Sequence, residues 1–268
     1  MADERRRAGG LLDFRISHEQ RLHFSAVLIT ILLASGRVFA GDIEFDPAIT
    51  QEEFSEFSQS VGQAIFASPL DGAASTSLLG FDLGIAATAV PIDETASFWL
   101  RSVGNSNLTR SGYLIVPRLV AAKGIGVLRI SASLAKVPDS DIQVYGGSVD
   151  LPLIRGGLLR PALSLRGSYS QLRGIEIYKA KTYGAEVFLS KGFGPVTPYA
   201  GVGMMRTNAT GTIPLSLVPG GLTRTLEDES DHNRFTLGVK VSILLPKIVI
   251  EATQGKDRTY AAKVSLGL

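Results

Sequence analysis

The side chains best able to do chemistry lie in one short stretch, Glu227-Asp228-Glu229-Ser230-Asp231-His232. A serine, a histidine and a carboxylate can act together as nucleophile, base and orienting acid, as in hydrolases. Residues adjacent in a flexible loop rarely converge in that geometry, so a solvated acidic loop is the simpler interpretation. The carboxylates also lack the spacing of a calcium-binding loop. We therefore expect no catalytic residue and no enzyme, and keep a lipid-modifying enzyme that uses His232 as an alternative.

Other chemistries lack the residues they need. The chain has no cysteine, which removes disulfides and thiolate ligands, and it shows no spacing typical of a metal site. It also carries no phosphate loop or dinucleotide fingerprint. Beyond residue 40, basic and acidic residues are equal in number, so charge gives no reason to expect nucleic-acid binding. The sequence therefore predicts no metal, no cofactor and no nucleic-acid partner.

A second set of charged residues occupies alternate positions in apolar segments. In the last third of the chain, Phe235, Leu237 and Val239 alternate with polar residues, and 259–268 repeats the pattern. Period two gives a strand one apolar face and one polar face, and a closed membrane barrel turns the apolar face to lipid. The charged residues that this alternation places on the lumen side are Asp82, Arg118, Arg129, Arg160, Arg166, Glu186, Lys240, Glu251 and Lys263.

These charges leave two interpretations of the lumen open. A basic residue at the lipid midplane would cost roughly 2–4 kcal/mol, which is why the polar face is expected inside. There the charges can form a filled core of salt bridges, as in narrow barrels, or line a polar conduit that leans positive. The filled core is slightly favoured, because ten strands are nearer to filled eight-stranded barrels than to open porins.

Connection lengths support a barrel. Every second connection is short, whereas 91–112, 172–181 and 209–233 are long, and outer-membrane barrels alternate tight periplasmic turns with larger outside loops. The predicted fold is all-β: a closed antiparallel transmembrane β-barrel of about ten strands, 79–268, with a short N-terminal amphipathic helix. The expected strands are 79–90, 113–121, 127–135, 142–151, 159–171, 182–191, 197–208, 234–244, 247–253 and 259–268.

Aromatic residues mark one end of these strands. They share the parity of the apolar face and lie near the long connections, which is typical of the girdle at the outer headgroup level. Aromatic residues favour strands in any case, so their parity is the stronger argument. The predicted girdle consists of Tyr113, Tyr145, Tyr169, Tyr183, Phe235 and Tyr260.

Residues 1–40 are expected to form an export signal. Several arginines precede an apolar core, Phe24–Ala34, that is too short to span a membrane, and Val38-Phe39-Ala40 suits cleavage after Ala40. A retained anchor is the alternative.

The following segment, 41–78, is acidic and contains a predicted helix at 52–67. Thr50 and Glu53 form a capping box, and Ser68-Pro69 ends the helix. The helix could lie on a surface, belong to a flexible leader, or plug the basic lumen with its phenylalanines packed inward or against a lipophilic ligand. The residues assigned to the plug are Glu52, Glu53, Phe54, Glu56, Phe57, Val61 and Ile65.

The signal and the strands of 79–268 together resemble bacterial outer-membrane β-barrel proteins. The helix followed by Leu79-Gly80-Phe81-Asp82-Leu83-Gly84 also looks like barrels distantly similar to long-chain fatty-acid transporters. This resemblance implies a location in the bacterial outer membrane, contact with its lipid, and insertion by the barrel insertion machinery. The last residue, Leu268, departs from the usual terminal Phe or Trp.

The leading functional hypothesis is passive passage or binding of a small hydrophobic or anionic molecule. Passage would run through the lumen or a lateral gap, with the helix as plug or gate. One alternative is a structural or adhesive barrel that displays its outside loops. A soluble periplasmic β-sandwich is the remaining alternative.

Overall fold

The computed structural model describes residues 43–73, 80–104, 109–110, 112–136, 141–157, 159–215 and 221–267, all within one compact unit, Val38–Leu268. The predicted signal and its cleavage after Ala40 lie outside the described residues. Neither helix in the described ranges is long and apolar enough to cross a membrane.

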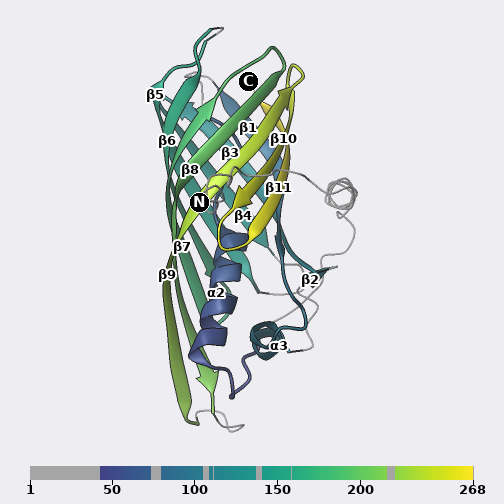
Figure 1. Cartoon of the computed structure of the whole chain (residues 1–268), viewed down its shortest axis with the longest axis vertical. Coiled ribbons are helices and arrows are strands. Elements are labelled where there is room, and N and C mark those ends of the chain that lie inside the picture. The colour runs from purple at the N-terminus through teal and green to yellow at the C-terminus, as the bar shows by residue number, and fades with distance from the viewer. Residues whose placement is uncertain are drawn as a thin grey trace, which may run out of the picture. The chain divides into compact units, whose positions relative to one another are not determined.

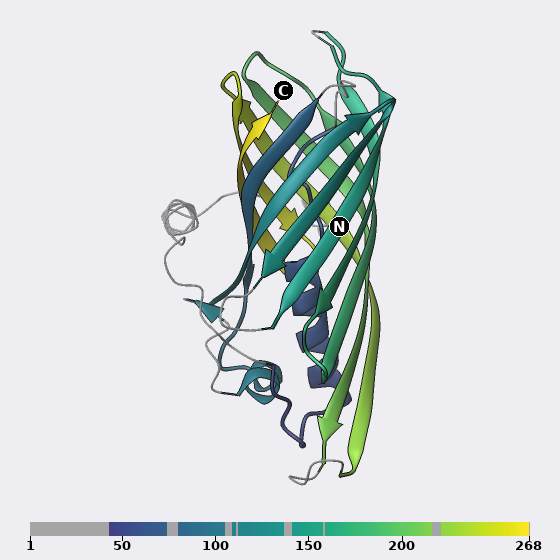
Figure 2. The same cartoon turned by 180° about the vertical axis from the view of Figure 1, so that it is seen from behind.

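The strands form a closed ring (Figures 1 and 2). Each strand pairs antiparallel with its neighbour, and β1 closes the ring by pairing with both β3 and β11. Ten described strands make the wall, and β2 adds two residues to the edge of β3. The elements are α2 (Gln51–Ile65), β1 (Phe81–Pro91), α3 (Ser97–Val103), β2 (Thr109–Arg110), β3 (Tyr113–Ile125), β4 (Leu128–Lys136), β5 (Gln143–Ile154), β6 (Ala162–Arg173), β7 (Tyr178–Ser190), β8 (Val196–Pro214), β9 (Thr223–Ser242), β10 (Pro246–Gln254) and β11 (Arg258–Gly267).

The wall is apolar outside and polar inside. Ile85 and Leu189 point outward and are 66% and 49% exposed, whereas Arg166 points inward and is 1% exposed. Burial alternates residue by residue along β6 and β7, as period two requires. This is the reverse of a soluble barrel, and it confirms the predicted transmembrane β-barrel of about ten strands with a short N-terminal helix.

Two predicted long connections, 172–181 and 209–233, are wrong. The first is reduced to 174–177, because β6 ends at Arg173 and β7 begins at Tyr178. Most of 209–233 is strand, because β8 continues to Pro214 and β9 begins at Thr223. Here both the outward side chains and much of the inward face are polar, so no alternation is visible in the sequence. A further correction concerns Arg160, which was predicted to face the lumen. Its side chain is exposed, because β6 starts only at Ala162, after Pro161, which has no backbone N–H to pair.

Helix α2 begins with the predicted capping box. Glu53 N–H donates to Thr50 Oγ1 over 3.2 Å, and Thr50 N–H donates to Glu53 Oε2 over 2.9 Å. The helix contacts β1, β3, β6, β7, β8 and β9, so wall strands lie around it. The views of Figures 1 and 2 both show it within the half of the barrel that carries α3 and the β8–β9 tip.

Candidate functional site

Residues 43–73, here called the lumen segment, run the length of the barrel. They run alongside β9 in the same chain direction, from the β8–β9 tip toward the opposite end of the barrel. The contacts, in chain order, are Arg224 with the carbonyl of Ile49, Gln51 with the carbonyl of Glu227, Ser55 with Asp228, Arg234 over the ring of Phe66, and Lys240 with Asp71. The segment therefore occupies the lumen.

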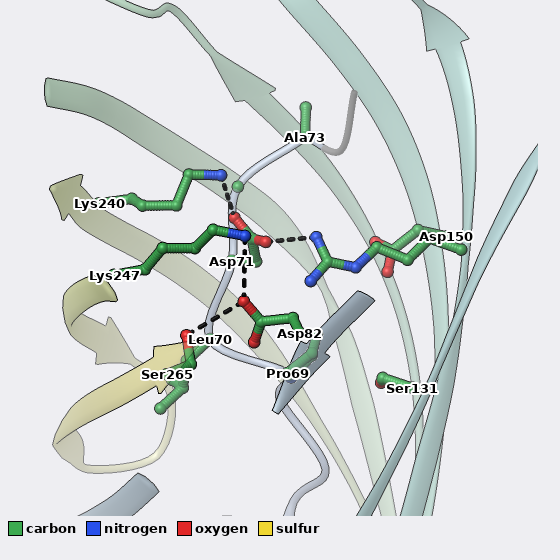
Figure 3. Close-up of polar contacts among 12 residues, drawn as sticks. Pro69, Leu70, Asp71, Ala73, Asp82, Ser131, Asp150, Lys240, Lys247 and Ser265 are labelled. Carbon is green, nitrogen blue, oxygen red and sulfur yellow. Dashed lines mark hydrogen bonds and ion pairs between the residues drawn. The ribbon is translucent and has the colours of Figure 1, made fainter. Parts of the chain in front are cut away.

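The half of the barrel with the short turns holds a network of buried charges centred on Asp71 (Figure 3), beside an apolar cluster that includes Leu70 and Phe188. Asp71 Oδ1 accepts from Lys240 Nζ over 2.6 Å, and Oδ2 pairs with Arg129. The carbonyl of Asp71 accepts from Arg166 Nη2 over 2.8 Å. Lys263 Nζ reaches both the carbonyl of Pro69 at 2.8 Å and Asp82 Oδ1 at 3.2 Å. The extended end of the lumen segment is thus fixed by cations from four strands.

Buried ion pairs continue around this half. Arg166 Nε lies 2.6 Å from Asp150 Oδ1, and Arg234 Nε lies 3.1 Å from Glu186 Oε1. Tyr199 donates to Glu251 Oε2 over 2.9 Å. The residues predicted to line the lumen lie here: Asp82, Arg118, Arg166, Glu186, Glu251 and Lys263 are buried, Arg129 and Lys240 are half-buried, and Arg160 alone is exposed.

These contacts favour the predicted lumen filled by salt bridges over the predicted polar conduit. Arg118 donates to the carbonyl of Phe66 over 2.7 Å, so a lumen cation serves the backbone of the lumen segment. The predicted match between helix acids and lumen bases is wrong in detail. Glu52 and Glu56 are exposed, and Glu53 pairs with Arg101 of α3 at 3.0 Å. Asp71, which follows the helix, meets the bases instead.

The half with the long connections is apolar. Phe54 and Phe57 of α2 are fully buried, and Val61 and Ile65 are nearly so. The Phe57 ring lies 5.4 Å from that of Tyr178 and 5.7 Å from that of Trp99, measured between centroids. The Phe57–Tyr178 contact is edge-to-face, and a contact of this kind adds roughly 0.5–1.5 kcal/mol to the burial itself. The predicted plug residues therefore separate into a buried apolar face and an acidic face toward solvent and α3.

A cavity of about 60 Å³ lies between α2 and the wall. Since one water needs about 10–15 Å³, the space holds several methylene groups. Enclosed apolar cavities stay dry and take apolar ligands, and the lining of this cavity is apolar apart from Lys136. We call it the wall cavity. Its lining includes Phe57, Val61 and Ile65 of α2, Trp99 of α3, Leu114, Val116 and Pro117 of β3, Ala135 and Lys136 of β4, Val144 of β5 and Leu172 of β6.

The wall is incomplete beside this cavity. The β3–β4 ladder ends at the pair Leu119 and Leu134, and β2 covers only Tyr113 and Leu114. Between them, residues 115–118 of β3 have no strand partner on the β4 side within the described part of the chain. Pro117 has no N–H to offer there. We call this gap the β3–β4 window.

Side chains show that the window reaches the outer surface. Leu114 and Val116 have inward parity yet are half-exposed, and Pro117, of outward parity, also lines the cavity. The outward neighbours Leu119 and Leu134 are apolar and exposed. The window therefore opens in the apolar band of the wall.

The predicted chemical cluster lies on a strand. Asp228, Ser230 and His232 share the inward face of β9, whereas Asp231 points outward and pairs with Arg206 at 2.7 Å. Ser230 donates to Asp228 over 3.0 Å, so its hydroxyl bonds to the carboxylate that would orient a base. The expected solvated loop is wrong, because these residues belong to β9. The Ser230 hydroxyl bonds to Asp228 and not to His232, so the serine and the histidine do not form a nucleophile–base pair.

The six predicted girdle residues lie on the outer wall. Tyr145, Tyr169, Tyr183 and Phe235 are exposed, and Tyr113 and Tyr260 are half-buried. The rings of Tyr169 and Tyr183 lie 5.2 Å apart on paired strands. Their role at the headgroup level stays a prediction.

Sequence reasoning missed Asp71, Asp150, Arg234 and the wall cavity. Asp150 and Arg234 lie at inward positions of β5 and β9 and within the predicted strands 142–151 and 234–244, so the same alternation would have assigned them to the lumen. Asp71 lies in an extended segment with no periodic pattern, and the cavity depends on where a ladder ends.

No family model matches the chain, and no curated protein matches it. Solved structures similar to it include the N-terminal β-barrel domain of Pseudomonas aeruginosa OprF, at 13% identity and a TM-score of 0.32, covering 70% of this chain and 97% of that one. Neisserial surface protein A matches at 15% identity and a TM-score of 0.30, covering 74% and 97%. Ail of Yersinia pestis matches at 12% and 0.30, covering 70% and 93%.

These likenesses are too distant to carry a function, and none of the three is a fatty-acid transporter, so that resemblance stays a prediction. The wall itself decides the location. The ten described strands of the wall close a ring that presents an apolar exterior band and encloses charges such as Arg166 and Lys263. The chain is a bacterial outer-membrane β-barrel.

Proposed function

We propose that this barrel binds one hydrophobic, chain-like molecule in the wall cavity and admits it from the membrane through the β3–β4 window. The observation that carries the proposal is an apolar cavity beside the part of the wall where β3 lacks a strand partner. Each methylene group moved into such a site from water contributes about 0.8 kcal/mol.

The lumen supports binding better than passage. The lumen segment fills it, and its bases are engaged by carboxylates or by backbone carbonyls such as that of Phe66. An anion would have to displace these contacts, whereas an apolar chain displaces nothing in the wall cavity. Helix α2 then has two roles, as a plug of the lumen and as one side of the binding site.

Lys136 gives the site a polar rim. Its side chain is exposed beside the cavity lining, and no ion pair of Lys136 occurs among the described residues. A ligand with an acidic head and an apolar tail fits this arrangement, with the tail against Phe57 and Val61 and the head near the Lys136 ammonium.

Trp99 provides a direct test, because it is the only tryptophan of the chain and lines the cavity. A fatty acid brominated along its tail should quench Trp99 fluorescence in the purified barrel, whereas the unbrominated acid should not. Filling the cavity with Ala135→Phe should weaken the quenching at least tenfold in apparent affinity.

Ala132→Phe is the matched control, since Ala132 lies on the same strand but is exposed on the outer wall. It should quench as the wild type does. Equal quenching in both variants, or none in the wild type, would exclude the wall cavity as the binding site.

A structural or adhesive role has its own support. The β8–β9 hairpin continues beyond the apolar band with a hydrophilic outward face that includes Thr212, Glu227 and Glu229. Such a hairpin is suited to contact with other molecules outside the cell. Replacing the outward side chains with Glu227→Lys and Glu229→Lys should then weaken surface adhesion while leaving Trp99 quenching intact, because the inward contacts of β9 with α2 are kept.

A further inference from the structure

The two ends of the lumen segment lie at opposite ends of the barrel. Ile49 meets Arg224, near the β8–β9 tip, and Asp71 meets Lys240, near the other end of the same strand. Sixteen residues of β9 separate these partners, about 50 Å along a strand and about 40 Å along a tilted barrel. The apolar band of such a barrel is only about 25 Å tall, so the segment crosses the whole membrane.

The connections show which end faces outward. The tight turns near Gly126, Gly194 and Leu244 lie at the end where Phe81 begins the wall and Gly267 ends it, together with the connection 155–161. The opposite end has the short connections 174–177 and 255–257, but it also carries the longest connection, 92–112 with α3, and the extended β8–β9 hairpin. Short turns are periplasmic in outer-membrane barrels, and long connections are external. Helix α3 and the β8–β9 tip, which lie beside Ile43–Thr50, are therefore at the external end (Figure 1).

The external end of the lumen segment is held in place. The N–H of Glu44 donates to the carbonyl of Ser102 over 3.0 Å, and that of Asp46 donates to the carbonyl of Arg101 over 2.8 Å. Arg101 also pairs with Glu53 at 3.0 Å. Three contacts to α3 thus fix residues 44–53 at the outer rim, where Glu44, Asp46 and Pro47 are exposed.

We propose that this barrel holds its lumen segment threaded across the outer membrane and presents residues 44–50 at the cell surface. The proposal rests on the direction of the lumen segment and is independent of the ligand proposed above. Strands β4, β6, β9 and β11 all bond to Pro69–Asp71, so the wall encloses the segment on several sides. The protein thereby exports a piece of its own chain to the surface.

Site-specific labelling tests this topology, because the chain contains no cysteine of its own. Glu44→Cys should react with a polyethylene-glycol maleimide, which does not cross the outer membrane, in intact cells. The extent should match that of Leu222→Cys, an exposed residue of the β8–β9 connection. Arg155→Cys, exposed in the short β5–β6 connection at the other end, should react only after the outer membrane is permeabilised.

Each variant is first checked for a closed barrel by its faster migration in an unheated gel. Pro47→Cys serves as a second external site if Glu44→Cys fails this check. The proposal is overturned if the Glu44 and Pro47 sites react only after permeabilisation, like Arg155→Cys. It is also overturned if Leu222→Cys is protected and Arg155→Cys is labelled in intact cells, because the barrel would then face the other way.

Discussion

The two halves of the lumen hold the same segment by different means. In the external half the segment is a helix whose apolar side chains, such as Phe54, pack against wall side chains such as Tyr178. In the periplasmic half it is extended among arginines and lysines. A helix satisfies its own backbone groups and can therefore lie in apolar surroundings, whereas extended backbone must find partners elsewhere. The lumen cations supply those partners to the carbonyls of Phe66, Pro69 and Asp71.

This comparison predicts that the lumen segment, and not the side chains of the wall, blocks passage through the lumen. Deleting residues 43–67 removes the helix that fills the external half and leaves a hydrated lumen. We expect discrete single-channel conductance in planar bilayers, where the intact protein shows none. Wild-type barrel purified and reconstituted in parallel is the control, and an equally silent deletion variant would show that the helix is no plug.

The next largest effect should come from the anchor in the periplasmic half. Asp71→Asn leaves the cations of Lys240 and Arg129 without their shared carboxylate. Removing one partner of a buried ion pair costs about 3–5 kcal/mol, which should appear as a lower thermal unfolding midpoint. Asp46→Asn, an exposed acid of the same segment, should change the midpoint little.

Phe54→Ala is the counterpart in the external half, since it removes a fully buried ring at a cost of about 3–5 kcal/mol. Only Asp71→Asn should also leave unpaired cations that attract anions into the lumen. If the two variants admit anions equally, as measured by conductance in chloride, the distinction between the halves fails.

The smallest effect concerns the first turn of α2. The hydrogen bond from the Thr50 N–H, assisted by Ser97 and Arg101, lowers the pKa of Glu53 from 4.5 to about 2 despite partial burial. A lowered pKa stabilises the fold above the ordinary value, and this stability is lost as pH falls from about 4.5 toward 2. Glu53→Gln should therefore cost about 1 kcal/mol at pH 7 and much less near pH 3.

The pH dependence is read from the difference in unfolding free energy between wild type and Glu53→Gln. Glu52→Gln, an exposed neighbour, should show no such trend. A Glu53→Gln deficit that stays constant from pH 7 to pH 3 would assign the effect to the helix itself and not to the carboxylate.

The sequence predicts the wall better than its contents. Strands such as β6 and β7 follow from alternation alone, because lipid and lumen impose opposite polarity on neighbouring residues. The external parts of β8 and β9 escape prediction, since Thr212 and Glu229 face water and no lipid enforces an apolar face there. The capping box fixes where α2 starts, but the sequence does not show that Asp71, beyond the helix, is the residue that meets the bases.

The wall cavity lies outside the reach of sequence patterns for another reason. The missing N–H of Pro117 is visible in the sequence, but Pro161 and Pro198 look the same there. Whether a proline interrupts a ladder depends on how far the neighbouring strand extends, and β4 ends its pairing with β3 at Leu134. That extent is a property of the assembled sheet.

The unequal height of the ladders has a mechanical consequence. The β8–β9 ladder runs from Val196 to Pro214, whereas β3 and β4 are joined only from Leu119 to Ile125. A barrel opens first between the two strands that share the fewest ladder hydrogen bonds. Force or heat should therefore separate β3 from β4 before any pair of neighbouring strands with a longer ladder. Amide hydrogens next to Leu119 should then exchange with solvent sooner than those of β8. Strands β3 and β4 can separate locally while the remaining wall stays paired.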